Sequence, residues 1–265
     1  MAGKIRAGIG GWTFEPWRGA FYPKDLKQKD ELAYASRHVT VIEVNSTYYS
    51  MQKPESWAKW AGEAPDDFVF AVKGSRYCTN RRVLAEAGPG IERFLSQGFT
   101  SLGPRLGPIL WQFMGTKKFD PEDFAGFLDL LPAAWEGVDL RHVVEVRHDS
   151  FMTPEFVALC RERRVAICLA EHATYPMIPD VTADFVYARL QVGSDDIPTG
   201  YPPEALNLWA RRLTAYAEGG APEDLSPVDR SAPEKKDRDV FAFFIHEGKV
   251  RAPAAAMALL ERVNT

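Results

Sequence analysis

The sequence predicts a single TIM-type (β/α)8 barrel. Eight short apolar segments recur along the 265 residues, and nearly every one is followed by a stretch with helical periodicity. Strands that alternate with helices in this way form parallel sheets with right-handed crossovers. Eight such units in a chain of this length are typical of a closed barrel. An open doubly wound sheet is the alternative, and it is disfavoured because no GxGxxG-type phosphate turn follows the first apolar segment.

The apolar segments give the expected strands. The first ends in glycine, and the later ones are rich in valine, isoleucine or phenylalanine, which favour strands. We expect strands at 5–10, from 41, at 68–73, at 108–113, from 143, at 166–170, at 185–191 and at 241–246.

Start signals and apolar periodicity give the expected helices. The clearest start is Asp120-Pro121-Glu122-Asp123, which has aspartate at the cap, proline at the first helical position and acidic residues in the first turn. We expect helices at 25–37, from 54, after 88–90, from 120, from 153, from 202 and at 253–263.

Two segments break the pattern. The link from Glu171 to Asp184 contains two prolines and no helical period, so we expect the barrel to be irregular around its sixth unit. The stretch from Gly219 to Asp239 is polar, charged and rich in proline, and we expect a mobile surface insert there. The whole chain, 1–265, is otherwise expected to form one domain.

Composition excludes several classes of function. The net charge is −4 and the pI is about 5.8, so no global basic field favours nucleic acid or anionic lipid. The three cysteines form no CxxC pair, which disfavours a disulfide framework or a zinc site. No signal-peptide core or membrane-spanning apolar run is present, so we expect a cytoplasmic protein, and no cofactor is predicted.

Charged residues interrupt two of the expected strands. Because strand side chains alternate between faces, Glu43 and Asn45 share one face, and so do Glu145 and Arg147. An ionised carboxylate in an apolar strand is costly unless it is paired. The seventh expected strand has the same spacing, because Arg189 and Gln191 also share one face. Charged residues scattered over the surface would not all lie on one face in three separate strands.

In a barrel, the carboxyl ends of the strands form the site. Three of the cations expected there, Lys73, Arg147 and Arg189, are suited to carboxylate or phosphate, and two carboxylates offset them only in part. The sequence therefore predicts a pocket for a small anionic molecule, with Glu43 and Glu145 as candidate catalytic groups. The candidate ligand-binding residues are Trp12, Asn45, Tyr48, Lys73, Arg147, Arg189, Gln191 and His246.

Other interpretations remain open. The charged residues could form ion pairs that only close the barrel, or the pocket could belong to a sensor that binds a metabolite without turning it over. A divalent metal is the competing chemistry, and its candidate ligands are Glu43, Glu145, Glu171, His172 and His246. A glycosidase with a Glu43 and Glu145 pair is a further alternative.

At these residues the sequence resembles the YecE-like family, domain of unknown function 72. The similar stretches include Gly10-Gly11-Trp12, Glu43-Val44-Asn45-Ser46-Thr47-Tyr48-Tyr49, Phe70-Ala71-Val72-Lys73, Glu145-Val146-Arg147-His148-Asp149 and Thr182–Leu190. The resemblance implies a TIM-type barrel without an established activity. It places Trp12, Glu43, Asn45, Tyr48, Lys73, Glu145, Arg147 and Arg189 at the mouth. The chain departs from the family pattern at Glu171, Gln191 and His246, which indicates a subfamily with its own ligand.

Overall fold

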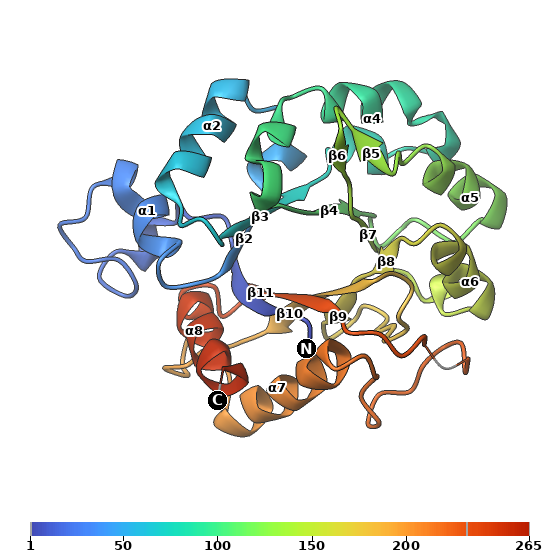
Figure 1. The fold of residues 1–265 in the computed structure, drawn as a ribbon. Coiled ribbons are helices and arrows are strands. Elements are labelled where there is room, and N and C mark those ends of the chain that lie inside the picture. Colours follow the sequence, from blue (N-terminus) through green and yellow to red (C-terminus); the bar gives the residue numbers. More distant parts are fainter. Residues whose placement is uncertain (1, 232, 265) are drawn as a thin grey trace.

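The computed structural model describes residues 2–231 and 233–264, and its parallel strands form the predicted barrel (Figure 1). The strands are β1 (Ile5–Gly10), β2 (Val41–Val44), β3 (Val69–Lys73), β4 (Leu106–Gln112), β7 (His142–Glu145), β8 (Ala166–Ile167), β9 (Leu169–Glu171), β10 (Phe185–Val192) and β11 (Asp239–Glu247). Their order in the sheet is β8-β7-β4-β3-β2-β1-β11-β10-β9. The two edges, β8 and β9, are halves of one strand interrupted at Cys168, so the sheet nearly closes on itself.

Helices surround the strands, as Figure 1 shows. The α-helices are α1 (Glu31–Ala35), α2 (Pro54–Glu63), α3 (Arg76–Thr79), α4 (Gly88–Leu95), α5 (Pro121–Asp129), α6 (Pro154–Glu162), α7 (Pro203–Ala217) and α8 (Ala252–Val263). The 3-10 helices are η1 (Glu15–Trp17), η2 (Gln28–Asp30), η3 (Ser46–Tyr48), η4 (Leu84–Glu86), η5 (Phe99–Arg105) and η6 (Asp149–Phe151). The start signal of α5 is confirmed, because the Asp120 side chain accepts a hydrogen bond from the backbone amide of Asp123.

Two local predictions need correction. The helix expected at 25–37 is shorter, because Lys27 has an extended backbone and helical hydrogen bonding begins only at Gln28. The sequence prediction also missed an antiparallel hairpin formed by β5 (Ala134–Trp135) and β6 (Val138–Asp139). Glu136 and Gly137 connect its strands with φ angles of 50° and 78°, the positive values that a tight hairpin turn requires.

The irregular sixth unit is confirmed. Residues 172–184, all of which the structure describes, contain no helix. The hydroxyl of Thr182 accepts from the amide of Ile167 at 3.1 Å and donates to the carbonyl of Val165 at 2.6 Å. The returning coil thus satisfies backbone groups beside the interrupted strand.

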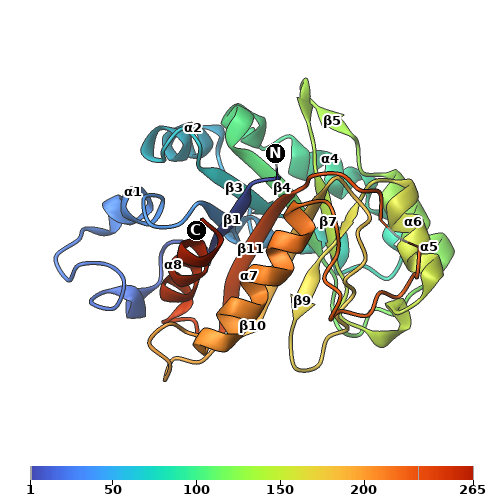
Figure 2. The same ribbon diagram turned by 60° about the horizontal axis from the view of Figure 1, so that its bottom comes forward.

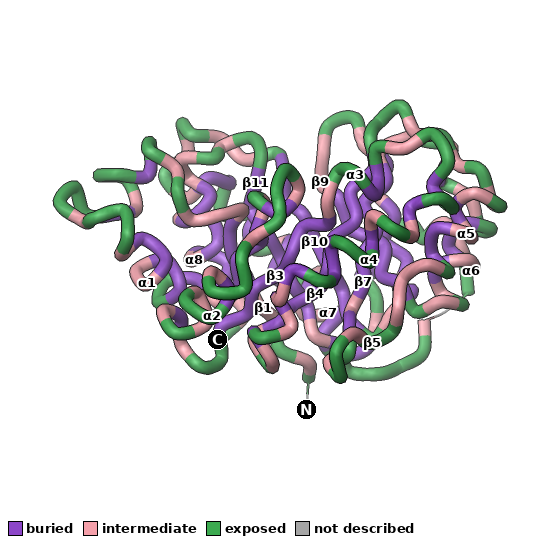
Figure 3. Tube along the Cα trace, turned by 90° about the horizontal axis from the view of Figure 1, so that it is seen from above, coloured by how far each residue is buried: buried purple, intermediate pink, exposed green. Residues whose placement is uncertain are grey.

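The core has two apolar clusters. The buried segments run through the middle of the molecule, and exposed segments lie at its periphery (Figure 3). An inner cluster fills the barrel, and an outer cluster lies between the strands and the helices. The predicted parity holds, because Val41 belongs to the inner cluster whereas Ile42 and Val44 belong to the outer one. Inner positions are apolar in the lower part of the barrel, with Val41, Val69, Leu110, Val143, Phe185 and Phe241 among them. The next inner positions on β2 and β7 are the charged residues Glu43 and Glu145.

The described residues 219–231 and 233–238 of the expected insert lie outside the barrel, beside α6 (Figure 2), whereas Asp239 begins β11. These residues before β11 form no helix or strand, and residue 232 lies outside the described part. The carboxylate of Asp180 accepts from the amides of Val228 and Asp229, each at 2.8 Å. Arg161 on α6 pairs with Asp229 as well. The mobility of this segment therefore stays a prediction, and these contacts are what any movement would have to break.

Within the described residues, no helix combines the length and the apolarity that crossing a membrane would need.

Candidate functional site

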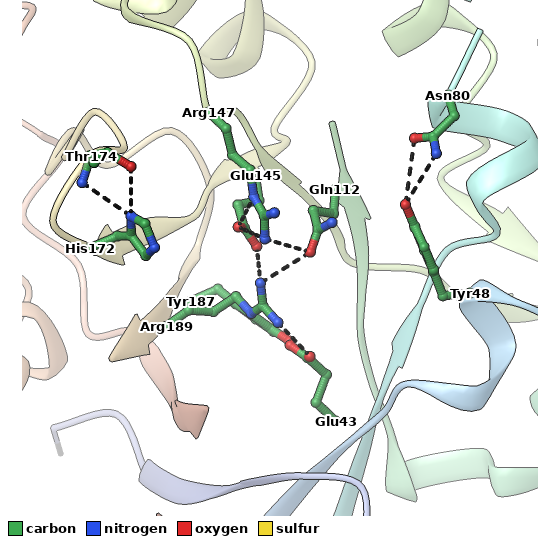
Figure 4. Close-up of polar contacts among 10 residues, drawn as sticks. All are labelled: Glu43, Tyr48, Asn80, Gln112, Glu145, Arg147, His172, Thr174, Tyr187 and Arg189. Atoms are coloured by element: carbon green, nitrogen blue, oxygen red, sulfur yellow. Dashed lines mark hydrogen bonds and ion pairs between the residues drawn. The ribbon is translucent and has the colours of Figure 1, made fainter. Parts of the chain in front are cut away.

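A buried ion network lies inside the barrel, above the apolar layers (Figure 4). The guanidinium of Arg189 on β10 lies between two carboxylates from other strands. Its Nη2 is 3.0 Å from Oε1 of Glu43 on β2, and its Nη1 donates to Oε2 of Glu145 on β7. Both glutamates are fully buried and Arg189 is 4% exposed. Strand parity thus brings together the three charged residues that the sequence placed on inner faces.

The guanidinium of Arg147 completes the network on the side that faces the cavity. Nε of Arg147 donates to Oε1 of Glu145 at 2.8 Å, and its Nη2 donates to the side-chain oxygen of Gln112 at 2.7 Å. The same oxygen accepts from Arg189 at 3.3 Å. Gln112 at the end of β4 therefore joins both arginines, although the sequence prediction did not include it among the candidate ligand-binding residues.

The sequence prediction also missed Tyr187. Its hydroxyl donates to Oε2 of Glu43 at 2.6 Å inside the barrel. Burial, reinforced by the charge of Glu43, raises the pKa of Tyr187 well above its usual value, so the hydroxyl keeps its proton. The alternation of side chains along the strand could have predicted this position, because Tyr187 lies on the same face as Arg189 and Gln191.

The ion network keeps the carboxylate of Glu145 ionised. Burial alone would raise the pKa of Glu145, but the neighbouring Arg189 and Arg147 outweigh it and lower the pKa below its usual value. Burial likewise opposes the charge of Arg189, and the adjacent Glu145 and Glu43 overcome it and raise its pKa. At neutral pH Glu145 and Arg189 are therefore charged partners of one another.

The electrostatic surroundings of Lys73 differ from those of Arg147 and Arg189. It lies at the end of β3, is 9% exposed, and has its ammonium 4.7 Å from the centre of the Tyr48 ring. It forms no hydrogen bond or ion pair through its side chain with any residue that the structure describes. Burial and the nearby charge of Arg189 lower the pKa of Lys73 to about 8.

A cavity of about 510 Å³ opens above the network. Eight of its lining residues are polar or charged and come from the ends of β3, β4, β10 and β11 and from the loops after β2, β7 and β11. They are Asn45, Lys73, Gln112, Arg147, Arg189, Gln191, His246 and Lys249. Its aromatic lining comes from Trp17, Tyr49 and Phe244. Polar and aromatic groups that converge on one concavity are typical of a small-molecule site.

The predicted aromatic wall is only partly in place. The ring of Trp12 packs edge-on against Trp60, with 4.9 Å between the ring centres, and Trp12 is absent from the cavity lining. Tyr48 lies beside Lys73, and its hydroxyl contacts the side-chain amide of Asn80 at 3.3 Å (Figure 4). Trp17 and Tyr49, which were not among the predicted ligand-binding residues, line the cavity instead.

Three further polar residues complete the cavity. Asn45 donates from its side chain to the carbonyl of Glu43 at 3.2 Å. The side-chain nitrogen of Gln191 is buried and has no hydrogen-bond partner among the described residues. His246 has a φ of 71°, a left-handed conformation that non-glycine residues adopt at an energetic cost. Strain of this kind and unused donors are frequent at ligand sites.

The residues proposed as metal ligands do not converge. Glu171 turns outward, where Oε2 accepts from Tyr201 at 2.9 Å and Oε1 accepts from the indole of Trp209 at 2.8 Å. His172 stacks on Tyr175 with 3.5 Å between the ring centres, and Tyr175 in turn lies under the guanidinium of Arg147. Across the described part of the chain, no group of three His, Cys, Asp or Glu residues is arranged to hold a metal ion.

The fold and the cavity define a TIM-type barrel protein with a polar, arginine-rich site at the carboxyl ends of its strands. Within that class, the chain belongs to the family described as "Protein of unknown function DUF72", whose model matches residues 6–265. The resemblance to the YecE-like family is thereby confirmed.

Individual relatives support the same assignment. The UPF0759 protein YecE of Escherichia coli K12 is 31% identical over 119 residues, which cover 44% of this chain and 41% of YecE. The match thus spans about two fifths of that relative's length. A DUF72 family protein of Thermotoga maritima has a TM-score of 0.71 at 20% identity, with 97% of each chain covered. One from Enterococcus faecalis has a TM-score of 0.71 at 16% identity, with 98% of this chain and 96% of the other covered. These structural likenesses show the fold.

Proposed function

We propose that this protein is an enzyme that binds a small anionic molecule, bearing a carboxylate or a phosphate, in the cavity at the mouth of the barrel. The observation that carries the proposal is the charge balance around the cavity. Four cations, Lys73, Arg147, Arg189 and Lys249, line the cavity and face two carboxylates, so the site holds two positive charges in excess. Lys73 and Lys249 form no ion pair with any described residue, and Lys73 is the more buried of the two. A bound anion would provide the missing partner.

The geometry divides the cations by role. Arg189 is enclosed by Glu43 and Glu145, and it fixes the two carboxylates. Arg147 is more exposed, with 18% of its side chain accessible, and it lines the cavity together with Lys73. An anion held between Lys73 and Arg147 would receive charge-assisted hydrogen bonds from both.

Nearby neutral donors would complete the binding site. The unpartnered nitrogen of Gln191 and the side-chain amide of Asn45 both belong to the cavity lining. They can bind the remainder of the molecule, because amide nitrogens donate to carbonyl, hydroxyl and phosphate oxygens alike.

The sequence assigned proton transfer to Glu43 or Glu145. The lowered pKa of Glu145 makes it a poor proton donor at neutral pH. Lys73 has a pKa of about 8, which lies close to the operating pH and suits a group that takes and returns a proton. We therefore assign proton transfer to Lys73, and we assign electrostatic and positioning roles to Glu43 and Glu145.

Thermal unfolding in the presence of sulfate tests the anion site. A ligand at a hundred times its Kd stabilises a protein by about 2.7 kcal/mol. For a domain of this size the midpoint should rise by about 5 °C. Sulfate also stabilises proteins by exclusion from their surface, so the matched control is the same titration on the double variant Lys73→Met, Arg147→Ala. A larger rise in the wild type supports the proposal, and equal rises contradict it. A chelator should leave the wild type unchanged, because the proposal involves no metal.

The pH dependence of sulfate affinity provides a second test. Below pH 8 the side chain of Lys73 is charged and attracts the anion, and above pH 8 it becomes neutral. Sulfate affinity should therefore fall as the pH rises through about 8, and binding should raise the pKa of Lys73 in return. Sulfate keeps its own charge over this range. An affinity that does not change between pH 7 and pH 9.5 would show that Lys73 does not contact the anion.

A further inference from the structure

The chemistry of Lys73 goes beyond holding an anion. A lysine becomes a nucleophile when it is desolvated or lies next to another cation, because both effects favour the neutral amine. Lys73 meets both conditions, since it is buried at the end of β3 and shares the cavity lining with Arg147 and Arg189. With its pKa lowered to about 8, more of the amine is neutral near neutral pH than in an ordinary lysine.

The end of β3 is held firmly in place. The hydroxyl of Thr47 donates to the carbonyl of Lys73 at 2.6 Å. Any side chain on the next residue, Gly74, would meet the Trp111 ring, whose nearest atom is 2.4 Å from the position of a Cβ. The backbone at Lys73 therefore packs tightly between β2 and β4. Such support is needed for a nucleophile that must meet its target in a fixed geometry.

The surroundings of the amine favour a bound carbonyl compound. The Tyr48 ring lies beside Nζ of Lys73. A carboxylate in that position would form an ion pair with the ammonium and keep it protonated. The guanidinium of Arg147 lines the same cavity and is suited to a carboxylate or phosphate group. A molecule that carries a carbonyl carbon near an anionic group could therefore place the carbonyl at Lys73 and the anion at Arg147.

We propose that Lys73 forms an imine with a small carbonyl compound that also bears a carboxylate or a phosphate, such as a 2-oxo acid or a keto sugar phosphate. This inference rests on the anion site proposed above and names the substrate class of that site. The imine would make the protein a carbonyl-processing lyase or isomerase, because a protonated imine withdraws electrons from the neighbouring carbon.

The step balances without an external reagent. The neutral amine of Lys73 attacks the carbonyl carbon, the π electrons move to the oxygen, and the oxygen takes up a proton. Transfer of a second proton to that oxygen releases it as water, and the nitrogen and carbon form a double bond. In total, one lysine ammonium and one carbonyl compound give one protonated imine and one water. The positive charge stays at the position of Nζ.

A second lysine of the same cavity provides the matched control. Lys249 also lines the cavity, and its ammonium lies 4.1 Å from the centre of the Phe14 ring. Unlike the buried Lys73, it is exposed and lies in a turn after β11, where its backbone carbonyl accepts from the indole of Trp17 at 2.8 Å. Partial burial lowers the pKa of Lys249 as well, so the two lysines differ chiefly in exposure and position. The proposal therefore predicts reaction at Lys73 and none at Lys249.

Reductive trapping tests the inference. The full chain is incubated with pyruvate, glyoxylate or dihydroxyacetone phosphate in turn and treated with sodium borohydride, which reduces an imine to a stable secondary amine. Peptide mass spectrometry then locates the modification. We expect at least one of the three probes to label Lys73 in the wild type and in Lys249→Arg. We expect no label at position 73 in Lys73→Arg, which keeps the charge but cannot form the imine.

The outcomes separate this inference from the anion site. A wild type that responds to sulfate as expected but gives no adduct with any probe overturns the imine and leaves the anion site intact. An adduct on Lys249, or one spread evenly over surface lysines, also overturns it. Sulfate protection retained in Lys73→Arg, with the adduct lost, would show that the charge and the nucleophile are separable functions of one side chain. A wild type that shows neither sulfate binding nor an adduct removes the proposed function itself.

Discussion

Two cations in the same barrel, Arg189 and Lys73, have opposite surroundings. Arg189 lies between two carboxylates, and the side-chain oxygen of Gln112 accepts from it as well. Lys73 is almost as well buried but has an aromatic ring beside it and no ion pair with any residue in the described ranges. The difference distinguishes charges that hold the strands together from a charge that is available to a ligand. Removing the first kind should destabilise the fold, whereas removing the second should stabilise it.

The largest effect is expected at Arg189. The variant Arg189→Met leaves Glu43 and Glu145 buried near each other without their shared partner, which should lower the free energy of unfolding by about 3–5 kcal/mol. Urea denaturation measures this change. The triple variant Arg189→Met, Glu43→Gln, Glu145→Gln removes the uncompensated charges and should recover part of the loss. A loss below about 1 kcal/mol in the single variant would contradict a structural role for the pair.

Within the ion network, we expect a smaller difference in stability between variants of Glu145 and Arg147. Glu145→Ala should cost about 3 kcal/mol, because it leaves Arg189 and Arg147 without their common carboxylate. Arg147→Ala should cost about 1 kcal/mol, since its side chain is partly exposed and water can replace some of its contacts. The same Arg147→Ala variant should lose most of the sulfate response. Equal destabilisation by both substitutions would indicate an ion network with a structural role alone.

At Lys73 the expected change has the opposite sign. Lys73→Met should raise the free energy of unfolding by about 1–2 kcal/mol, because a buried ammonium without an ion pair is replaced by an apolar chain of similar length. The folded-state pKa of about 8 lies below the ordinary value of 10.5, so the ammonium opposes folding fully below pH 8. The advantage of the variant should therefore shrink as the pH rises from 8 and disappear near 10.5. A variant less stable than the wild type at pH 7 would show that Lys73 has a stabilising partner.

The smallest effect is expected outside the barrel. Limited proteolysis should cleave first between Gly219 and Asp239, because this segment has no regular structure in its described part. Asp180→Ala removes the acceptor of two backbone amides in the segment and should speed cleavage there. The thermal midpoint should change little, since the ion network and the barrel core are untouched. First cleavage in another loop would contradict the expected mobility.

Some features could be read from the sequence because they depend on local periodicity. The alternation of apolar segments with helical stretches predicted the barrel, and the capping signal at Asp120 predicted the start of α5. Strand parity placed Glu43, Glu145 and Arg189 on inner faces. It would also have placed Tyr187 there, and it would have placed Glu171 outside, because Cys168 belongs to the inner cluster and Leu169 to the outer one.

Other features depended on the tertiary structure alone. The sequence placed Lys73, Arg147 and Arg189 at one mouth as equivalent cations, and only the distances between strands distant in the sequence showed which of them are paired. Trp12, which the sequence placed among the candidate ligand-binding residues, packs against Trp60, whereas Trp17 lines the cavity. The periodicity of a strand fixes the face on which a side chain lies, whereas its partners depend on register and on loop paths. A lysine without an ion pair becomes recognisable only when every neighbour has been placed.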